Sequence, residues 1–151
     1  KYYPKGYPMT PQRVTLITLG VADLERSEAF YSALGWSPAR EMPGEVVFYQ
    51  IHGMALGLFG LGPLANDQGR PDTPLGTGAM TLAQNFSTEA EVDIAYKQAL
   101  VAGATSLKQP QKVFWGGYSG YYADPDGHVW EVAHNPFWEL NDDGSLTLPA
   151  P

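Results

Sequence analysis

Cysteine is absent from this chain of 151 residues. Disulfide bridges, thiolate nucleophiles and cysteine-based zinc sites are therefore excluded. Because a chain without cysteine suits a reducing compartment, we predict a cytoplasmic location.

Basic residues are few as well. Nine lysines and arginines are outnumbered by sixteen aspartates and glutamates, which gives a net charge of −7. The basic residues do not cluster anywhere along the chain. Because contacts to phosphate groups require clustered positive charge, we expect no nucleic-acid partner.

Long apolar runs are also missing. The longest, at residues 54–65, is interrupted by glycine and proline and is too short to cross a bilayer. We therefore expect no membrane segment. Residues 1–11 precede the regular pattern, and we expect them to form an N-terminal arm or to be a remnant of expression or processing.

The apolar content is nevertheless sufficient for a folded core. Hydrophobic residues make up 44% of the chain and aromatic residues 13%. These fractions are typical of a globular chain, and the length suits one domain.

The first half of the chain contains alternating strand and helix signals. Residues 13–21 are rich in β-branched and apolar side chains, which predicts a buried strand. Asp23 is a helix N-cap residue before an amphipathic segment over 24–34. Two further strands are predicted over 45–50 and 54–59.

The second half repeats this order after a segment rich in glycine and proline at residues 61–78, which we interpret as a linker. A strand is predicted over 80–86. Thr88 and Glu91 then have the spacing of a capping box, and Gly103 is a helix stop.

A hairpin is predicted at the end of the repeat. Segments 113–115 and 118–123 have strand composition, residues 124–127 read Asp-Pro-Asp-Gly, and a return strand is expected over 129–133. Matching positions in the two halves lie about 65 to 75 residues apart, so the sequence predicts two copies of one α+β unit.

Two motifs carry a resemblance to a known family. The pattern D-L-x-x-S-x-x-F-Y spans residues 23–31, and D-P-D-G-x-x-x-E spans residues 124–131. With the strand and helix of the second half, they resemble the vicinal oxygen chelate superfamily, which includes glyoxalase I, extradiol dioxygenases, and fosfomycin- and bleomycin-resistance proteins.

The resemblance implies an α+β fold of two βαβββ modules whose curled mixed sheets form a cleft. It implies one domain over residues 12–136, with module one at 12–60, the linker at 61–78 and module two at 79–136. Residues 137–151 would then be a C-terminal tail packed on the domain. The resemblance also implies a homodimer.

Metal-using relatives carry ligands at four matching strand positions. In this chain these positions are occupied by Leu16, Gly57, Thr81 and Glu131. Leucine and glycine offer no ligand side chain, and threonine is a poor ligand for zinc, nickel or iron. We therefore expect no metal site and no cofactor.

Glu131 is the residue of greatest interest, because a lone carboxylate in an apolar strand is costly unless it has a use. It could contact a cationic ligand, act as a general base, or bond a tyrosine hydroxyl and only complete the sheet. Strand alternation and an assumed pairing of Ala123 with His128 predict further residues that bind ligand: Leu16, Thr18, Phe48, Thr81, Asn85, Tyr118 and Tyr122. Trp115 is added because Gly116 and Gly117 after it make a flexible lip.

These observations favour a metal-independent protein that binds an unknown small molecule. One alternative is a glyoxalase-like lyase or isomerase that uses Glu131 as base or holds a weak metal; dioxygenase chemistry is disfavoured by the missing ligands. Another alternative is a vestigial cleft that serves as an interaction module.

Overall fold

The structure, a computed structural model, describes residues 10–151, so the arm predicted over 1–11 lies almost wholly outside the described residues. Its first sheet has the strand order β1-β4-β3-β2, in which β1 is parallel to β4 and the other neighbours are antiparallel. Its elements are β1 (Leu16–Val21), α1 (Leu24–Ala33), β2 (Arg40–Met42), β3 (Val46–Ile51) and β4 (Met54–Gly60).

The second sheet repeats this topology with the order β5-β8-β7-β6, and β5 is parallel to β8. Its elements are β5 (Thr81–Asn85), α3 (Glu89–Ala102), β6 (Thr105–Lys112), β7 (Tyr118–Ala123) and β8 (Val129–His134). The predicted α+β fold of two βαβββ modules is confirmed.

The two long helices begin at the predicted caps. The Asp23 carboxylate accepts from the Arg26 N–H at 3.1 Å, and the Thr88 hydroxyl accepts from the Glu91 N–H at 3.1 Å. Helix α3 ends at Gly103, whose φ of 114° is a left-handed conformation that glycine adopts without steric cost.

Local structure departs from the sequence prediction in three places. The linker contains a two-turn helix, α2 (Leu61–Asp67), which packs against β1 and β4. Residues 113–115 form part of a turn, whereas the strand paired with β7 is β6, at residues 105–112. The short edge strand β2 also went unrecognised, because its side chains are all exposed and show no alternation.

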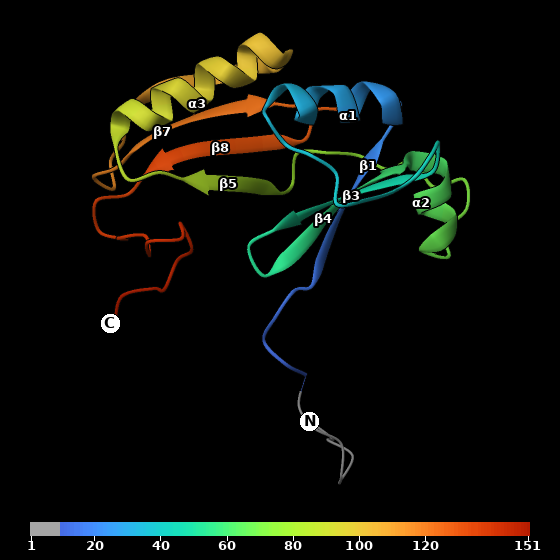
Figure 1. The fold of residues 1–151 in the computed structure, drawn as a ribbon, viewed down its shortest axis with the longest axis horizontal. Helices are drawn as coiled ribbons and strands as arrows, with labels where there is room; N and C mark the ends of the chain where they lie inside the picture. The colour runs from blue at the N-terminus through green and yellow to red at the C-terminus, as the bar shows by residue number, and fades with distance from the viewer. Residues whose placement is uncertain (1–9) are drawn as a thin grey trace, which may run out of the picture.

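Helix α3 lies above the second sheet, and helix α1 lies beside it above the first sheet, on the same side of the molecule (Figure 1). Apolar side chains from both helices and both sheets form one core. Helix α1 bridges the modules, because the Tyr31 hydroxyl donates to Asp124 at 2.7 Å and accepts from the Trp130 indole at 3.1 Å.

The hairpin between β7 and β8 has a different register from the predicted one. The Asp124 N–H donates to the His128 carbonyl at 2.9 Å, and Gly127 has a φ of 92°. The hydrogen bond closes a three-residue loop over 125–127. Ala123 therefore pairs with Val129 rather than with His128. Since side chains alternate along a strand, the shift moves every β7 side chain to the opposite face from the prediction.

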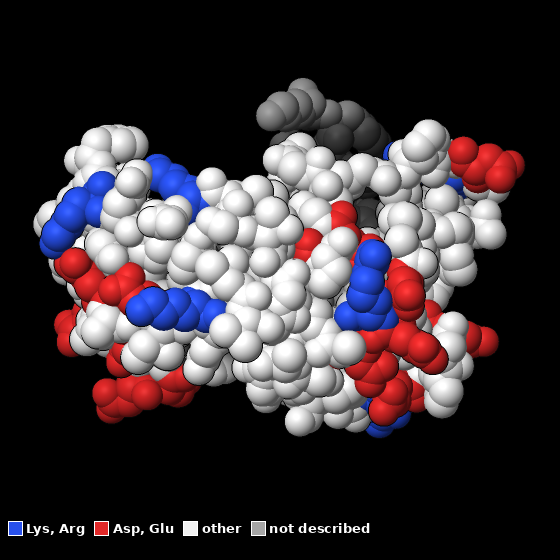
Figure 2. Space-filling model, turned by 90° about the horizontal axis from the view of Figure 1, so that it is seen from above, with Lys and Arg blue, Asp and Glu red and all other residues white. Residues whose placement is uncertain are grey.

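No helix among residues 10–151 is long and apolar enough to cross a membrane. On the face that carries the helices, lysine and arginine side chains are scattered singly among acidic ones (Figure 2). That face therefore presents no continuous basic patch of the kind that nucleic-acid backbones require.

Candidate functional site

The second sheet has an open face, which is the face turned away from helix α3. Trp130 and Val132 of β8 lie in the core, so Val129 and Glu131 lie on the open face. In the neighbouring strand β5, Ala83 pairs with Glu131.

A pocket of about 470 Å³ lies on this open face, and we name it the Glu131 pocket. Its walls come from β5, β8, the β6–β7 turn and the first residues of the tail. They consist of Ala83, Asn85, Trp115, Glu131, Ala133, Asn135, Phe137 and Trp138. A pocket of this size, mostly apolar with a few polar groups, is typical of small-molecule sites.

Two glycines in the β6–β7 turn allow the aromatic wall to form. A β-carbon on Gly117 would lie 1.7 Å from the Trp115 ring, and one on Gly116 would lie 2.9 Å from the Phe137 ring. Trp115 and Phe137 thus pack directly against backbone, which positions both rings at the mouth of the pocket.

Glu131 is half-buried and pairs across the hairpin with Tyr121. Burial raises the pKa of the Tyr121 phenol, and hydrogen bonding to the Glu131 carboxylate and its negative charge raise it further. Tyr121 therefore stays neutral, and its hydroxyl can donate a hydrogen bond to the carboxylate.

Because of the observed register, two predicted ligand-binding residues, Tyr118 and Tyr122, do not lie in the Glu131 pocket. Tyr122 is only 2% exposed and belongs to the core. Tyr118 also lies on the helix face, where its hydroxyl donates to Asp93 of α3 at 2.7 Å. Both side chains therefore point away from the Glu131 pocket, and Tyr121 occupies the position that the prediction assigned to its neighbours.

The remaining predicted residues divide into two groups. Glu131, Asn85 and Trp115 come together in the Glu131 pocket. Leu16, Phe48 and Thr81 lie outside its walls, and Thr18 lines a separate cavity described below.

The four positions that correspond to metal ligands offer one carboxylate and no histidine. Thr18 and the Phe48 ring cover Gly57, at 3.6 and 3.1 Å from the place of a β-carbon. Among residues 10–151, no group of three or more histidine, aspartate or glutamate side chains has an arrangement that could hold a metal ion. A single carboxylate, Glu131, does not provide the donor set that a tightly held divalent ion needs.

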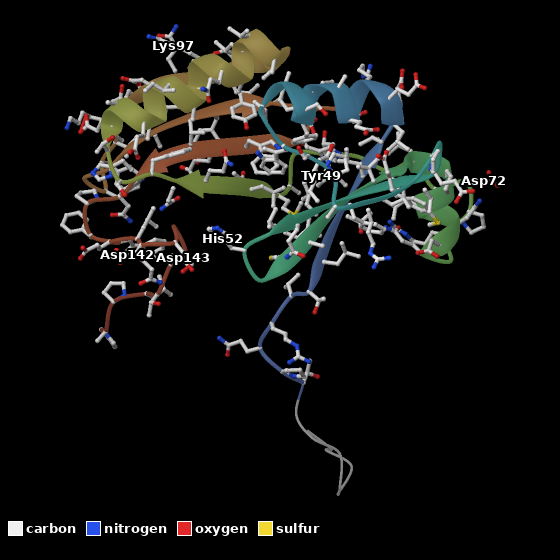
Figure 3. All side chains as sticks on the ribbon, viewed as in Figure 1. Tyr49, His52, Asp72, Lys97, Asp142 and Asp143 are labelled. Carbon is white, nitrogen blue, oxygen red and sulfur yellow. The ribbon has the colours of Figure 1, made fainter. Side chains whose placement is uncertain are left out.

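Sequence reasoning missed the contribution of the tail to the site. Phe137 and Trp138 line the pocket, and further along the tail Gly144 lies 3.4 Å from the His52 ring, measured from its would-be β-carbon. Figure 3 shows His52, at the β3–β4 turn, close to Asp142 and Asp143. The aromatic pair in the tail was the available signal, because exposed aromatic residues often mark binding surfaces.

Comparison with known proteins agrees with this architecture. The sequence model of the Glyoxalase/Bleomycin resistance protein/Dioxygenase superfamily matches residues 13–132. The chain belongs to this superfamily. A glyoxalase-related enzyme from Fulvimarina pelagi is 40% identical, with a TM-score of 0.86 over 93% of this chain and 100% of that chain.

Two more distant relatives place this superfamily member in context. A lactoylglutathione lyase from Agrobacterium tumefaciens is 25% identical, with a TM-score of 0.65 over 87% of this chain and 100% of that chain. An uncharacterised protein from Mycobacterium tuberculosis is 35% identical over 50% of this chain and 43% of its own length. The matched region thus spans less than half the length of that curated relative.

Proposed function

We propose that this protein binds a small cationic or amine-bearing molecule in the Glu131 pocket without the help of a metal ion. The observation that carries the proposal is the location of one carboxylate, Glu131, in a pocket walled by Trp115, Phe137 and Trp138. A cation is attracted both to the carboxylate and to the faces of aromatic rings. The open volume of about 470 Å³ favours ligand binding over a vestigial cleft.

The amides of Asn85 and Asn135 add neutral hydrogen-bonding groups to the same walls. They can orient a ligand without adding charge. The pocket therefore suits a molecule with one positive group, an apolar or aromatic body, and one or two polar substituents.

The binding test compares a cation, benzyltrimethylammonium, with a neutral counterpart, benzyl alcohol. Binding is measured by tryptophan fluorescence in the presence of EDTA. We expect the cation to bind more tightly and Glu131→Gln to weaken its binding about tenfold. Glu45→Gln, which removes an exposed carboxylate from the turn before β3, is the matched control. Equal binding of the two probes, or loss of binding in EDTA, would contradict the proposal.

The enzyme alternative has one specific observation in its favour, which is the pairing of Glu131 with Tyr121. A carboxylate beside a neutral phenol can take up and return a proton, as a general base must. Turnover of lactoylglutathione, the compound named for the Agrobacterium relative, is the direct assay. Activity that Glu131→Gln abolishes, while the variant remains folded, would replace the binding function by catalysis.

We also propose a homodimer. The first sheet exposes apolar side chains outside both pockets, including Leu16 and Met42, which are 43% and 55% exposed. The Glu131 pocket takes no residue from module one, so a second copy could cover it. Light scattering coupled to gel filtration should show twice the chain mass, and a monomer at micromolar concentration would exclude this assembly.

The cytoplasmic location stays a prediction from composition.

A further inference from the structure

A second cavity, of about 790 Å³, lies between the two modules and shares no lining residue with the Glu131 pocket. We name it the linker cavity, because residues 74–80 form one of its walls. The other walls are the end of β1, helix α2 and the turn between β7 and β8.

Close backbone contacts hold these walls together. A β-carbon on Gly20 would lie 2.9 Å from Leu61 and 3.1 Å from Leu64, so both leucines of α2 rest on the backbone of β1. On the other side, the Thr77 hydroxyl lies 3.2 Å from the place of a β-carbon on Gly127. The linker therefore spans from one module to the turn of the other, and the cavity between them is partly open to solvent.

The lining is largely apolar. Leu61, Leu64, Leu75 and Met80 contribute to it, and Met80 is 53% exposed. Contacts with these side chains would remove apolar surface of both ligand and protein from water. The walls thus suit a ligand with an aliphatic or aromatic body.

Most charged groups in the cavity are already neutralised. Arg26 forms an ion pair with Asp126 at 3.0 Å, and the same carboxylate accepts from the Ala22 N–H at 2.8 Å. The His128 ring bonds the Gly20 carbonyl at 2.7 Å; since a carbonyl only accepts, Nε2 carries the hydrogen.

Arg70 is different, because no carboxylate within residues 10–151 forms an ion pair with it. Its guanidinium donates to the Gln68 side-chain carbonyl at 3.0 and 2.5 Å, which leaves its full positive charge uncompensated. The remaining guanidinium N–H groups are available to a carboxylate, which they can bind in a bidentate manner.

The backbone around Arg70 is held in a defined position. Its N–H donates to the Ala65 carbonyl at 2.9 Å, and its carbonyl accepts from the Thr73 N–H at 3.1 Å. Pro71 and Asp72 lie between, and Asp72 has a φ of 63°, the left-handed conformation of a type II turn. This turn fixes the backbone position from which the Arg70 side chain extends. Asp72, in the same turn, is labelled in Figure 3.

We propose that the linker cavity binds a small amphipathic carboxylate, with the carboxylate on Arg70 and the apolar body against Leu61, Leu64 and Met80. The site combines one uncompensated cation with an apolar wall, in a volume that can enclose a ligand of modest size. It is independent of the Glu131 pocket, which has the opposite charge.

The test is isothermal titration with octanoate, compared with octylammonium and with 1-octanol at equal concentration. We expect octanoate to bind one per chain, and octylammonium to bind at least tenfold more weakly. Arg70→Gln should weaken octanoate binding about tenfold, because a charge-assisted hydrogen bond is lost. Lys97→Gln is the matched control, since it removes one positive charge from the exposed face of α3 (Figure 3) and should leave the affinity within twofold.

Two further variants separate binding from folding. Arg70→Lys keeps the charge but not the bidentate geometry, and it should restore part of the affinity that Arg70→Gln loses. Ala79→Trp fills the cavity from its exposed linker wall and should weaken both octanoate and 1-octanol, with the circular dichroism spectrum unchanged. Glu131→Gln should not alter octanoate binding, so this proposal and the proposed function fail separately.

Several results would overturn the proposal. They are unchanged octanoate affinity in Arg70→Gln, equal affinity for octylammonium, or amide shifts on octanoate addition that centre on the Glu131 pocket rather than on residues 74–80.

Discussion

The Trp115 indole lies directly on the α-carbon of Gly117, so that a β-carbon there would come within 1.7 Å of the ring. No side chain larger than hydrogen fits without moving the ring. Because Trp115 is one wall of the Glu131 pocket, Gly117 determines the shape of the site without touching a ligand itself.

We predict that Gly117→Ala displaces Trp115 and weakens benzyltrimethylammonium binding as much as Trp115→Ala does. The protein should remain folded, with a loss of about 1–3 kcal/mol in the free energy of unfolding from the forced rearrangement. Gly62→Ala is the control, because a β-carbon on Gly62 in α2 would meet no atom within 4 Å. A Gly117→Ala variant with unchanged tryptophan emission and affinity would show that the ring is elsewhere in solution.

Replacing Tyr49 and replacing Tyr31 should have opposite effects on the stability of the protein. Both are buried in the same aromatic cluster, with ring centroids 5.9 Å apart. Tyr49 is labelled below α1 in Figure 3. Its hydroxyl is buried and has no hydrogen-bond partner in the described part of the chain. The Tyr31 hydroxyl bonds both Asp124 and Trp130.

Tyr49→Phe should therefore stabilise the protein by about 1 kcal/mol, because it removes a buried polar group that folding leaves unsatisfied. Tyr31→Phe should destabilise it by about 1–3 kcal/mol, since the buried Asp124 carboxylate and Trp130 indole would each lose a hydrogen bond. Urea denaturation measures both. Destabilisation by Tyr49→Phe would mean that its hydroxyl bonds a water molecule in solution.

Much of the fold could be predicted from local chemistry. Asp23, Thr88 and Gly103 begin or end helices by interactions within one or two turns, and the repeated order of such signals indicated two modules. The register around Gly127 could not be settled in this way, because one residue more or less in a loop depends on its hydrogen bonds.

The candidate sites were less predictable than the fold, since each gathers residues that are far apart in the sequence. Glu131 could be identified from strand position and residue type, and Trp115 from the glycine pair that follows it. Phe137 and the Arg70 turn could not, because only the path of the tail and of the linker brings them to a cavity. Such paths depend on tertiary packing rather than on periodicity.

Stability at alkaline pH should reflect the buried phenols. Burial is the main cause that raises the pKa of Tyr31, Tyr49 and Tyr122, to about 12 for Tyr49. In the unfolded chain these groups lose their protons near pH 10. Because the folded state holds the protons longer, the free energy of unfolding should be constant below about pH 9 and fall as the pH rises above about 10.

Urea denaturation between pH 8 and pH 11 measures this dependence. Tyr49→Phe should make the decline shallower, since one of the protons released on unfolding is then missing. A flat profile up to pH 11 would contradict the burial of these three side chains.

Asp126 joins the two modules, and its replacement should be costly. Its carboxylate is 5% exposed and accepts from the Ala22 N–H, from Arg26 at 3.0 Å and from the Ser27 hydroxyl at 2.5 Å. Asp126→Asn removes the charge and replaces one acceptor oxygen by a donor. We expect a loss of about 1–3 kcal/mol in the free energy of unfolding, because the buried Ser27 hydroxyl and the half-exposed Arg26 lose their charged partner.

The surface pair of Lys112 and Glu89 is the comparison for Asp126, because it is even closer, at 2.7 Å against 3.0 Å, but its side chains are 77% and 40% exposed. Glu89→Gln should cost less than about 1 kcal/mol, since water and salt screen an exposed ion pair. Urea denaturation at low and high salt measures both variants. If Asp126→Asn costs no more than Glu89→Gln, the contact between α1 and the β7–β8 turn does not hold the modules together, and the linker cavity between them would lose its fixed wall.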